Sequence, residues 1–329
     1  MNLKSNLLQQ IEKLMKRTNS HSIETRHRYE EATERFCSFL AEEFHLQKFK
    51  NVKPKHFESY VQKMASDGYA GKTITTDLSG IRFFHELSES RFKLPSNAEL
   101  KKSGINLPEV EFGVVDRAWT NTEIENAKII AFAMGRLDVV TGIDLSWNFG
   151  LRINELASLR VSQMKNALSD PELLVRGKGG VVRVIEVRTS PQIISLNSAI
   201  DYAKAAARDR YSDRVLASSA KGGVRHEKES LQNWISNHRK KFEEDFRQKY
   251  SEKYEGQKLF CEAHGFKLNT ENISWHGLRH AFAQELYEEL HTEYLNKGHS
   301  PEKAAYLARR DVSYRLGHYR DSITSLYLR

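Results

Sequence analysis

Side chains that suit phosphate chemistry gather near the end of the sequence. The segment HGLRH at 276–280 carries two imidazoles and a guanidinium, LGH at 316–318 carries a third imidazole, and Tyr327 carries a phenol. Arg279 offers a planar fork of donors that can grip two phosphate oxygens, and it stays charged at any working pH. If a helix continues from residue 276, the spacing of three puts His276 and Arg279 on one face. We therefore predict that these residues form a site for phosphate chemistry.

The same histidines raise the question of a metal site. His276 and His280 have the spacing of a zinc-binding HExxH helix. That motif requires glutamate at its second position, where this chain has Gly277, and no acidic third ligand follows at a recognisable distance. We therefore expect no metal here.

Two stretches far upstream supply further cations. A pentacoordinate phosphate needs a second arginine to offset its charge, and Arg152 in GLRINEL stands at an expected helix start, with Glu155 one turn on as an orienting partner. Residues 172–188 are rich in β-branched side chains and are interrupted by the sequence GKGG at 177–180. This pattern predicts a β-hairpin whose turn carries Lys178.

Together these motifs resemble the complete signature of the tyrosine recombinases, the phage-integrase type of site-specific recombinase. The signature consists of Arg152 within GLRxxEL, Lys178 in a hairpin turn, HGLRH at 276–280, and LGH followed nine residues after its histidine by Tyr327. The motifs stand in the family's order, and the N-terminal part of the chain resembles the family's core-binding domain more loosely. The ending YLR after a long helical insertion is similar to integrases of bacterial mobile elements.

The resemblance implies roles for the matched residues. Tyr327 would attack a DNA phosphodiester, giving a 3′-phosphotyrosyl enzyme and a free 5′-hydroxyl. Arg152 and Arg279 would clamp the scissile phosphate, while His276 and His318 would hydrogen-bond it and assist proton movement. This division suits the chemistry, because a tyrosine is a weak nucleophile that needs neighbours to accept its proton and stabilise the developing charge.

Lys178 would complete the reaction by protonating the 5′-oxygen leaving group. Tyr319 competes with Tyr327 as the nucleophile, but it follows His318 directly, where the family places none. His280 repeats a common family residue, and we expect it to pack behind the site. Because the covalent intermediate keeps the energy of the broken phosphodiester, the implied reaction needs no ATP, metal or other cofactor.

The implied partner is double-stranded DNA with a specific recombination site, bound by a homo-tetramer on synapsed DNA, with accessory DNA-bending proteins as further partners. Two alternatives stay open. A type IB topoisomerase shares the nucleophile but relaxes DNA as a monomer, so site dependence and synapsis would separate the two. A DNA-binding relative could keep the fold without the chemistry, but the complete residue set argues against it. In the N-terminal domain, Lys72 and Arg82 bracket a helix that could lie along the major groove, unless they only form a solvated face.

The composition limits the number of domains and the class of protein that the chain can form. The 329 residues suffice for two domains, and 39% hydrophobic with 29% charged residues is typical of a globular chain. The formal net charge of +8 suits a polyanionic partner. No apolar run approaches the roughly 18 residues of a spanning helix, and the N-terminus lacks the apolar segment of a secretory signal, so we expect a cytoplasmic protein without membrane contact. Cys37 and Cys261 belong to no metal or redox motif, and we expect free thiols.

The periodicity predicts two domains in a mainly α fold. Residues 1–90 are predicted to form a small helical domain, which the family resemblance implies to be a SAM-like core-binding domain that binds DNA. Residues 91–118 read as a linker, because the helical period fades among prolines and glycines. Residues 119–329 read as a mostly helical catalytic domain with a small β-hairpin. Within it, the long stretch between Arg279 and His318, with Gly298 and Pro301 in its middle, predicts an inserted pair of helices.

Overall fold

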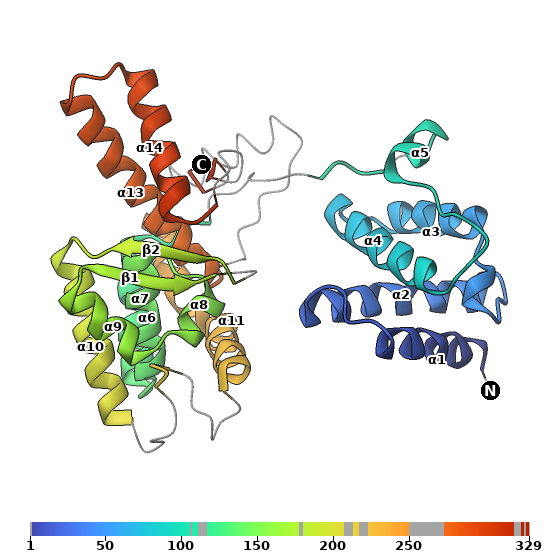
Figure 1. Ribbon diagram of the computed structural model, residues 1–329, viewed down its shortest axis with the longest axis horizontal. Coiled ribbons are helices and arrows are strands. Elements are labelled where there is room, and N and C mark those ends of the chain that lie inside the picture. The colour runs from blue at the N-terminus through green and yellow to red at the C-terminus, as the bar shows by residue number, and fades with distance from the viewer. Residues whose placement is uncertain are drawn as a thin grey trace. The chain divides into compact units, whose positions relative to one another are not determined.

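The computed structural model describes residues 2–105, 107–110, 117–177, 180–206, 213–216, 223–249, 273–318, 324–325 and 327–328. The chain divides into two compact units, Met1–Phe112 and Gly113–Arg329. The fold is mainly helical with one described two-stranded sheet, as the sequence predicted (Figure 1). Across the described ranges, no helix is both long and apolar enough to span a bilayer.

Helices packed around an apolar core form the first unit. Its elements are α1 (Leu3–Lys16), α2 (Ile23–Glu43), the 3-10 helix η1 (Phe49–Asn51), α3 (Pro54–Ser66), α4 (Gly71–Leu87) and α5 (Asn97–Lys102). α2 packs against both α1 and α4, and inward side chains such as Phe36 and Ile81 are fully buried. Two of these helices begin at residues that favour helix starts: the Ser22 hydroxyl accepts a hydrogen bond from the Thr25 amide, and Pro54 begins α3.

The segment predicted as a linker contains structure that belongs to the first unit. Ser96 and Glu99 form a reciprocal capping box at the start of α5. Leu94, Leu100 and Ile105 are buried in the core of this unit. The first unit therefore continues past residue 90. The helical period is absent because these apolar residues lie on a short helix and irregular chain.

The second unit holds the remaining elements. They are α6 (Asn121–Ala133), α7 (Leu137–Phe149), α8 (Ile153–Ser158), α9 (Val161–Ser169), β1 (Glu172–Arg176), β2 (Val182–Glu186), α10 (Ser190–Ala206), α11 (Gly223–Lys249), α13 (His276–Asn296) and α14 (Pro301–Arg315). Thr120 and Glu123 form a reciprocal capping box at the start of α6. After Arg152 the chain forms two separate helices, α8 and α9. Arg160 between them is extended and pairs with Arg214 in an isolated bridge.

The predicted hairpin is confirmed in its strands. β1 and β2 are antiparallel, with Leu173 opposite Ile185 and Val175 opposite Arg183. Residues alternate between exposed and buried along both strands, so these four side chains face inward. Lys178 and Gly179, at the expected turn, lie outside the described residues.

The inserted helix pair between Arg279 and His318 is also confirmed. α13 ends at Asn296, and α14 begins at Pro301 with Ser300 as its N-cap. The two helices pack side by side (Figure 1). Buried residues from both helices share a cluster with Tyr327. The pair therefore forms the wall against which Tyr327 lies.

Candidate active site

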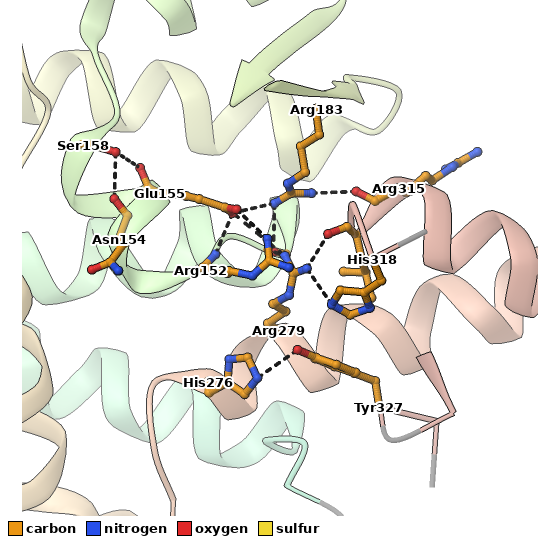
Figure 2. Close-up of polar contacts among 12 residues, drawn as sticks. Arg152, Asn154, Glu155, Ser158, Arg183, His276, Arg279, Arg315, His318 and Tyr327 are labelled. Atoms are coloured by element: carbon orange, nitrogen blue, oxygen red, sulfur yellow. Dashed lines mark hydrogen bonds and ion pairs between the residues drawn. The ribbon is translucent and has the colours of Figure 1, made fainter. Parts of the chain in front are cut away.

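Arg152 is positioned by the turn between α7 and α8. Gly150 ends α7 in the left-handed conformation, with φ 57° and ψ 37°, which favours glycine. Arg152 is the N-cap of α8, where its amide donates to Glu155 Oε2 at 2.9 Å and its Nη1 donates to Oε1 at 2.7 Å. Figure 2 shows this pairing. Glu155 therefore orients Arg152, as the sequence predicted.

Arg183 on β2 is a central residue of the site that sequence reasoning missed. Its side chain is only 3% exposed. Nη2 donates to Glu155 Oε2 at 2.8 Å and to the Gly150 carbonyl at 3.1 Å, and Nη1 donates to the Arg315 carbonyl at 2.6 Å (Figure 2). A charged side chain at an inward position of an alternating strand was the signal that could have found it.

Arg279 connects the end of α7 to the end of α14. Its guanidinium is fully buried. Nη1 donates to the Gly150 carbonyl, and Nη2 donates to the Leu316 carbonyl at 2.5 Å and to His318 Nε2 at 3.1 Å. Because arginine has no acceptor, Nε2 of His318 must be the acceptor. Arg279 thus selects the His318 tautomer that carries its proton on Nδ1.

Tyr327 reaches the same place from the end of the chain. Its phenol oxygen lies 3.0 Å from His276 Nε2 (Figure 2). The residue is 7% exposed. The competing Tyr319 lies outside the described residues. The structure therefore brings together Arg152, His276, Arg279, His318 and Tyr327 of the predicted set.

The site carries more positive than negative charge. Arg152 and Arg183 bind Glu155 directly, and Arg279 Nη1 lies 3.9 Å from the same carboxylate. Burial alone would raise the pKa of Glu155, but Arg183, the Arg152 amide and Arg279 hold it below its ordinary value. Burial and the other two arginines lower the pKa of Arg279 to about 9, which leaves it charged at neutral pH. Three guanidiniums facing one carboxylate make a site suited to an anion.

The two predicted catalytic imidazoles are neutral at pH 7. Burial, Arg279 and Arg152 lower the pKa of His276 to about 4, although this residue keeps access to the surface. The same three causes lower the pKa of His318 to about 3. A neutral imidazole 3.0 Å from a phenol can accept its proton. Bound phosphate would offset the arginines and make this transfer easier.

The two predicted DNA-binding residues of the first unit differ in setting. Lys72 is exposed on α4. Arg82 donates from Nε and Nη2 to the Pro95 carbonyl at 2.9 and 2.7 Å and from Nη2 to Asn97 Oδ1 at 2.9 Å, and it lies over the Phe57 ring. These contacts give the Arg82 guanidinium a structural role within its own unit. In the described part of the chain, no three His, Cys, Asp or Glu side chains could hold a metal ion together.

Comparison with known proteins supports the resemblance to tyrosine recombinases that the sequence motifs predicted. Residues 4–94 match the family described as phage integrase, N-terminal. The chain carries a phage-integrase N-terminal domain and has the tyrosine recombinase fold. The family resemblance inferred from the sequence is thereby confirmed. None of the curated proteins compared with this integrase-like chain matches it.

Three solved structures illustrate the shared recombinase fold. A lambda integrase tetramer bound to a Holliday junction has a TM-score of 0.59 at 14% identity, over 97% of this chain and 76% of that one. The Tn1549 transposon integrase with transposon right end DNA has a TM-score of 0.53 at 13% identity, over 100% and 95%. The XerH site-specific recombinase on a palindromic difH substrate has a TM-score of 0.56 at 16% identity, over 97% and 80%.

Proposed function

We propose that the protein is a site-specific DNA recombinase that cleaves and rejoins DNA through a 3′-phosphotyrosyl intermediate. The observation that carries this proposal is the 3.0 Å separation of the Tyr327 phenol oxygen and His276 Nε2. The pair lies beside arginines whose summed charge exceeds that of the one carboxylate they share. A nucleophile next to a neutral base, with cations ready for a phosphate, is the arrangement that phosphoryl transfer to tyrosine requires.

In the proposed cleavage step, the Tyr327 oxygen bonds to phosphorus while the bond from phosphorus to the 5′-oxygen breaks. Neutral His276 takes the phenol proton, and Lys178 gives a proton to the departing 5′-oxygen. The reverse exchange, with a 5′-hydroxyl attacking the phosphotyrosine, rejoins the strand. Each step exchanges one phosphodiester for another, so the proposed reaction uses neither ATP nor a metal ion.

The two clamping arginines contribute in different ways. Arg152 keeps 29% of its side chain exposed, so its guanidinium can turn donors toward a phosphate. Arg279 is fully buried, and both of its Nη atoms already donate to backbone carbonyls. We therefore infer that Arg152 makes the direct grip. Arg279 supplies charge and holds His318, which would hydrogen-bond the phosphate.

The proposed partner is duplex DNA with a defined recombination site. The net charge of +8 supports a polyanionic partner. The lambda integrase compared above is a tetramer on a Holliday junction, and Tn1549 integrase and XerH are likewise in complexes with DNA. By analogy we propose a homo-tetramer on synapsed DNA. Accessory DNA-bending proteins remain a prediction from the family resemblance.

A duplex with a nick close to the cleavage position tests the proposal, because the short cleaved fragment diffuses away and traps the covalent enzyme. Candidate element-junction sequences supply the site. We expect a covalent complex with the natural enzyme and none with Tyr327→Phe, while Tyr319→Phe, the matched control, keeps it. Covalent complex formation by Tyr327→Phe would overturn the assignment. Cleavage of any duplex regardless of sequence, by an enzyme that forms no synaptic complex, would favour the topoisomerase alternative.

The role proposed for Lys178 has its own test. A 5′-bridging phosphorothiolate has a sulfur leaving group that needs no proton. Lys178→Ala should therefore cleave normal DNA slowly but this substrate at close to the natural rate. Equal defects on both substrates would exclude Lys178 as the acid.

A further inference from the structure

Three residues on α13 contact Tyr327 along its length. His276 meets the phenol oxygen, the ring of His280 stacks on the phenol ring, and Gln284 Nε2 donates to the Tyr327 carbonyl at 3.3 Å. These positions are four residues apart, so they form one line along the helix face. Tyr327 is therefore held at its reactive atom, its ring and its backbone by a single helix.

His280 makes the closest ring contact of this line. Its ring centroid lies 4.2 Å from that of Tyr327, with 22° between the planes. The ring of His276 stands nearly perpendicular to His280, at 5.2 Å and 82°. His280 and Tyr327 are only 6% and 7% exposed. The phenol ring is thus fixed by a stacked neighbour inside the protein and is not free to rotate in solvent.

The two histidines act on different parts of the phenol. His276 places a nitrogen at hydrogen-bond distance from the oxygen, where a proton can be exchanged. His280 presents its face to the ring. A ring stacked in this way limits the side-chain rotamers of its neighbour without taking part in proton transfer. The geometry separates a base from a residue that holds the nucleophile in place.

We propose that His280 is a positioning residue that keeps the Tyr327 phenol oxygen next to His276 before DNA is cleaved. This inference rests on the proposed function, since it presumes that Tyr327 is the nucleophile. Loss of the stacked ring would let the phenol move away from its base. A displacement of about 1 Å at a reacting atom costs on the order of 100-fold in rate.

The test compares single-turnover cleavage of the nicked duplex by His280→Ala and His280→Phe. We expect the alanine variant to be slower by about 10- to 100-fold at saturating DNA, with DNA affinity within about twofold of natural. The phenylalanine variant keeps a stacking ring and should recover most of the rate. His291→Ala is the matched control: His291 lies on the same helix and stacks on Tyr287 at 5.5 Å and 10°. It should cleave normally.

A second substrate separates positioning from general damage. A strand ending in a 3′-p-nitrophenyl phosphate can be joined by attack of a DNA 5′-hydroxyl, with p-nitrophenolate leaving, so Tyr327 takes no part. His280→Ala should react with it as fast as the natural enzyme. Natural-rate cleavage by His280→Ala would overturn the proposal, as would an equal defect on both substrates or a phenylalanine variant as slow as the alanine one. If the natural enzyme forms no covalent complex with the nicked duplex, the proposed function itself is wrong, and the role of His280 falls with it.

Discussion

The Tyr327 phenol oxygen and His276 Nε2 are 3.0 Å apart although the two residues are separated by 51 positions in the chain. The pairing joins the first residue of α13 to the end of the chain. Its chemical value depends on the protonation of His276, because only a neutral imidazole can accept the phenol proton.

The lowered histidine pKa values predict an unusual pH dependence. The pKa of His276 lies at about 4 and that of His318 at about 3, below the ordinary value of about 6.5. Both groups should stay neutral as the pH falls from 8 to about 5. Nuclear magnetic resonance of the ring nitrogens, assigned with His276→Gln and His318→Gln, should show these two titrating below pH 5. At DNA concentrations far below saturation, where the rate reports the pKa values of the free enzyme, cleavage should show no inflection near pH 6.5 that disappears in His276→Gln. Such an inflection would contradict the prediction.

Bound anion should move the same pKa values upward. The arginines lower both pKa values, and a phosphate between them offsets part of their charge. Addition of a duplex with a 5′-methylene phosphonate at the scissile position, which has no 5′-oxygen to leave and cannot be cleaved, should raise the His276 pKa. A neutral methylphosphonate at that position should raise it less.

Arg183 should contribute more to stability than any exposed ion pair of this unit. It and Glu155 are 3% and 2% exposed, and loss of one partner from such a buried pair costs about 3–5 kcal/mol. Arg183→Met should lower the free energy of unfolding by that order, measured with urea. Arg183→Met combined with Glu155→Gln should cost less than the sum of the two single changes, because each single change already loses the pairing between these two residues and the double variant loses it only once. Simple additivity would show that the two residues act separately.

Sequence reasoning located the parts of the site that local signals define. The helix start at Arg152 and the helix pair after Arg279 follow from residues that begin or break helices and from apolar periodicity, which depend on neighbours within a few positions. The six catalytic candidates came from a motif resemblance, not from periodicity. The structure gathers five of them, and Lys178 lies outside its described residues.

Contacts between residues far apart in the chain could not be predicted from such local signals. Arg183 donates to the carbonyl of Arg315, 132 residues later, and no local pattern encodes such a partner. Only its inward register on β2 indicated that a buried acceptor must exist. His280 was expected to pack behind the site. It does pack, but against Tyr327 itself, and that contact required the path of the chain end.

Gly277 should be required for placing the start of α13. A Cβ there would lie 2.4 Å from the Arg117 carbonyl oxygen and 2.4 Å from Trp119 Cδ1. Gly277→Ala must therefore displace the chain at 117–119 or the helix start that carries His276, and cleavage should fall by at least about tenfold. Gly298→Ala is the control: it has nothing within 4 Å but a φ of +84°, so it should lose about 1 kcal/mol of stability and cleave normally. Equal cleavage by both variants would contradict the prediction.

Tyr327 should act on the active site of its own chain. Its phenol oxygen, ring and carbonyl meet His276, His280 and Gln284 of its own chain, so one protomer can hold the nucleophile beside its own base. Equal mixtures of Tyr327→Phe and Arg152→Gln enzymes on the nicked duplex decide the matter. If the nucleophile serves its own site, every active site lacks one component and the mixture stays as inactive as its parts. If Tyr327 crossed to a neighbour, the Arg152→Gln protomer would donate its tyrosine to the intact arginines of the Tyr327→Phe protomer. Covalent complex on the Arg152→Gln chain, appearing only in the mixture, would therefore refute the prediction.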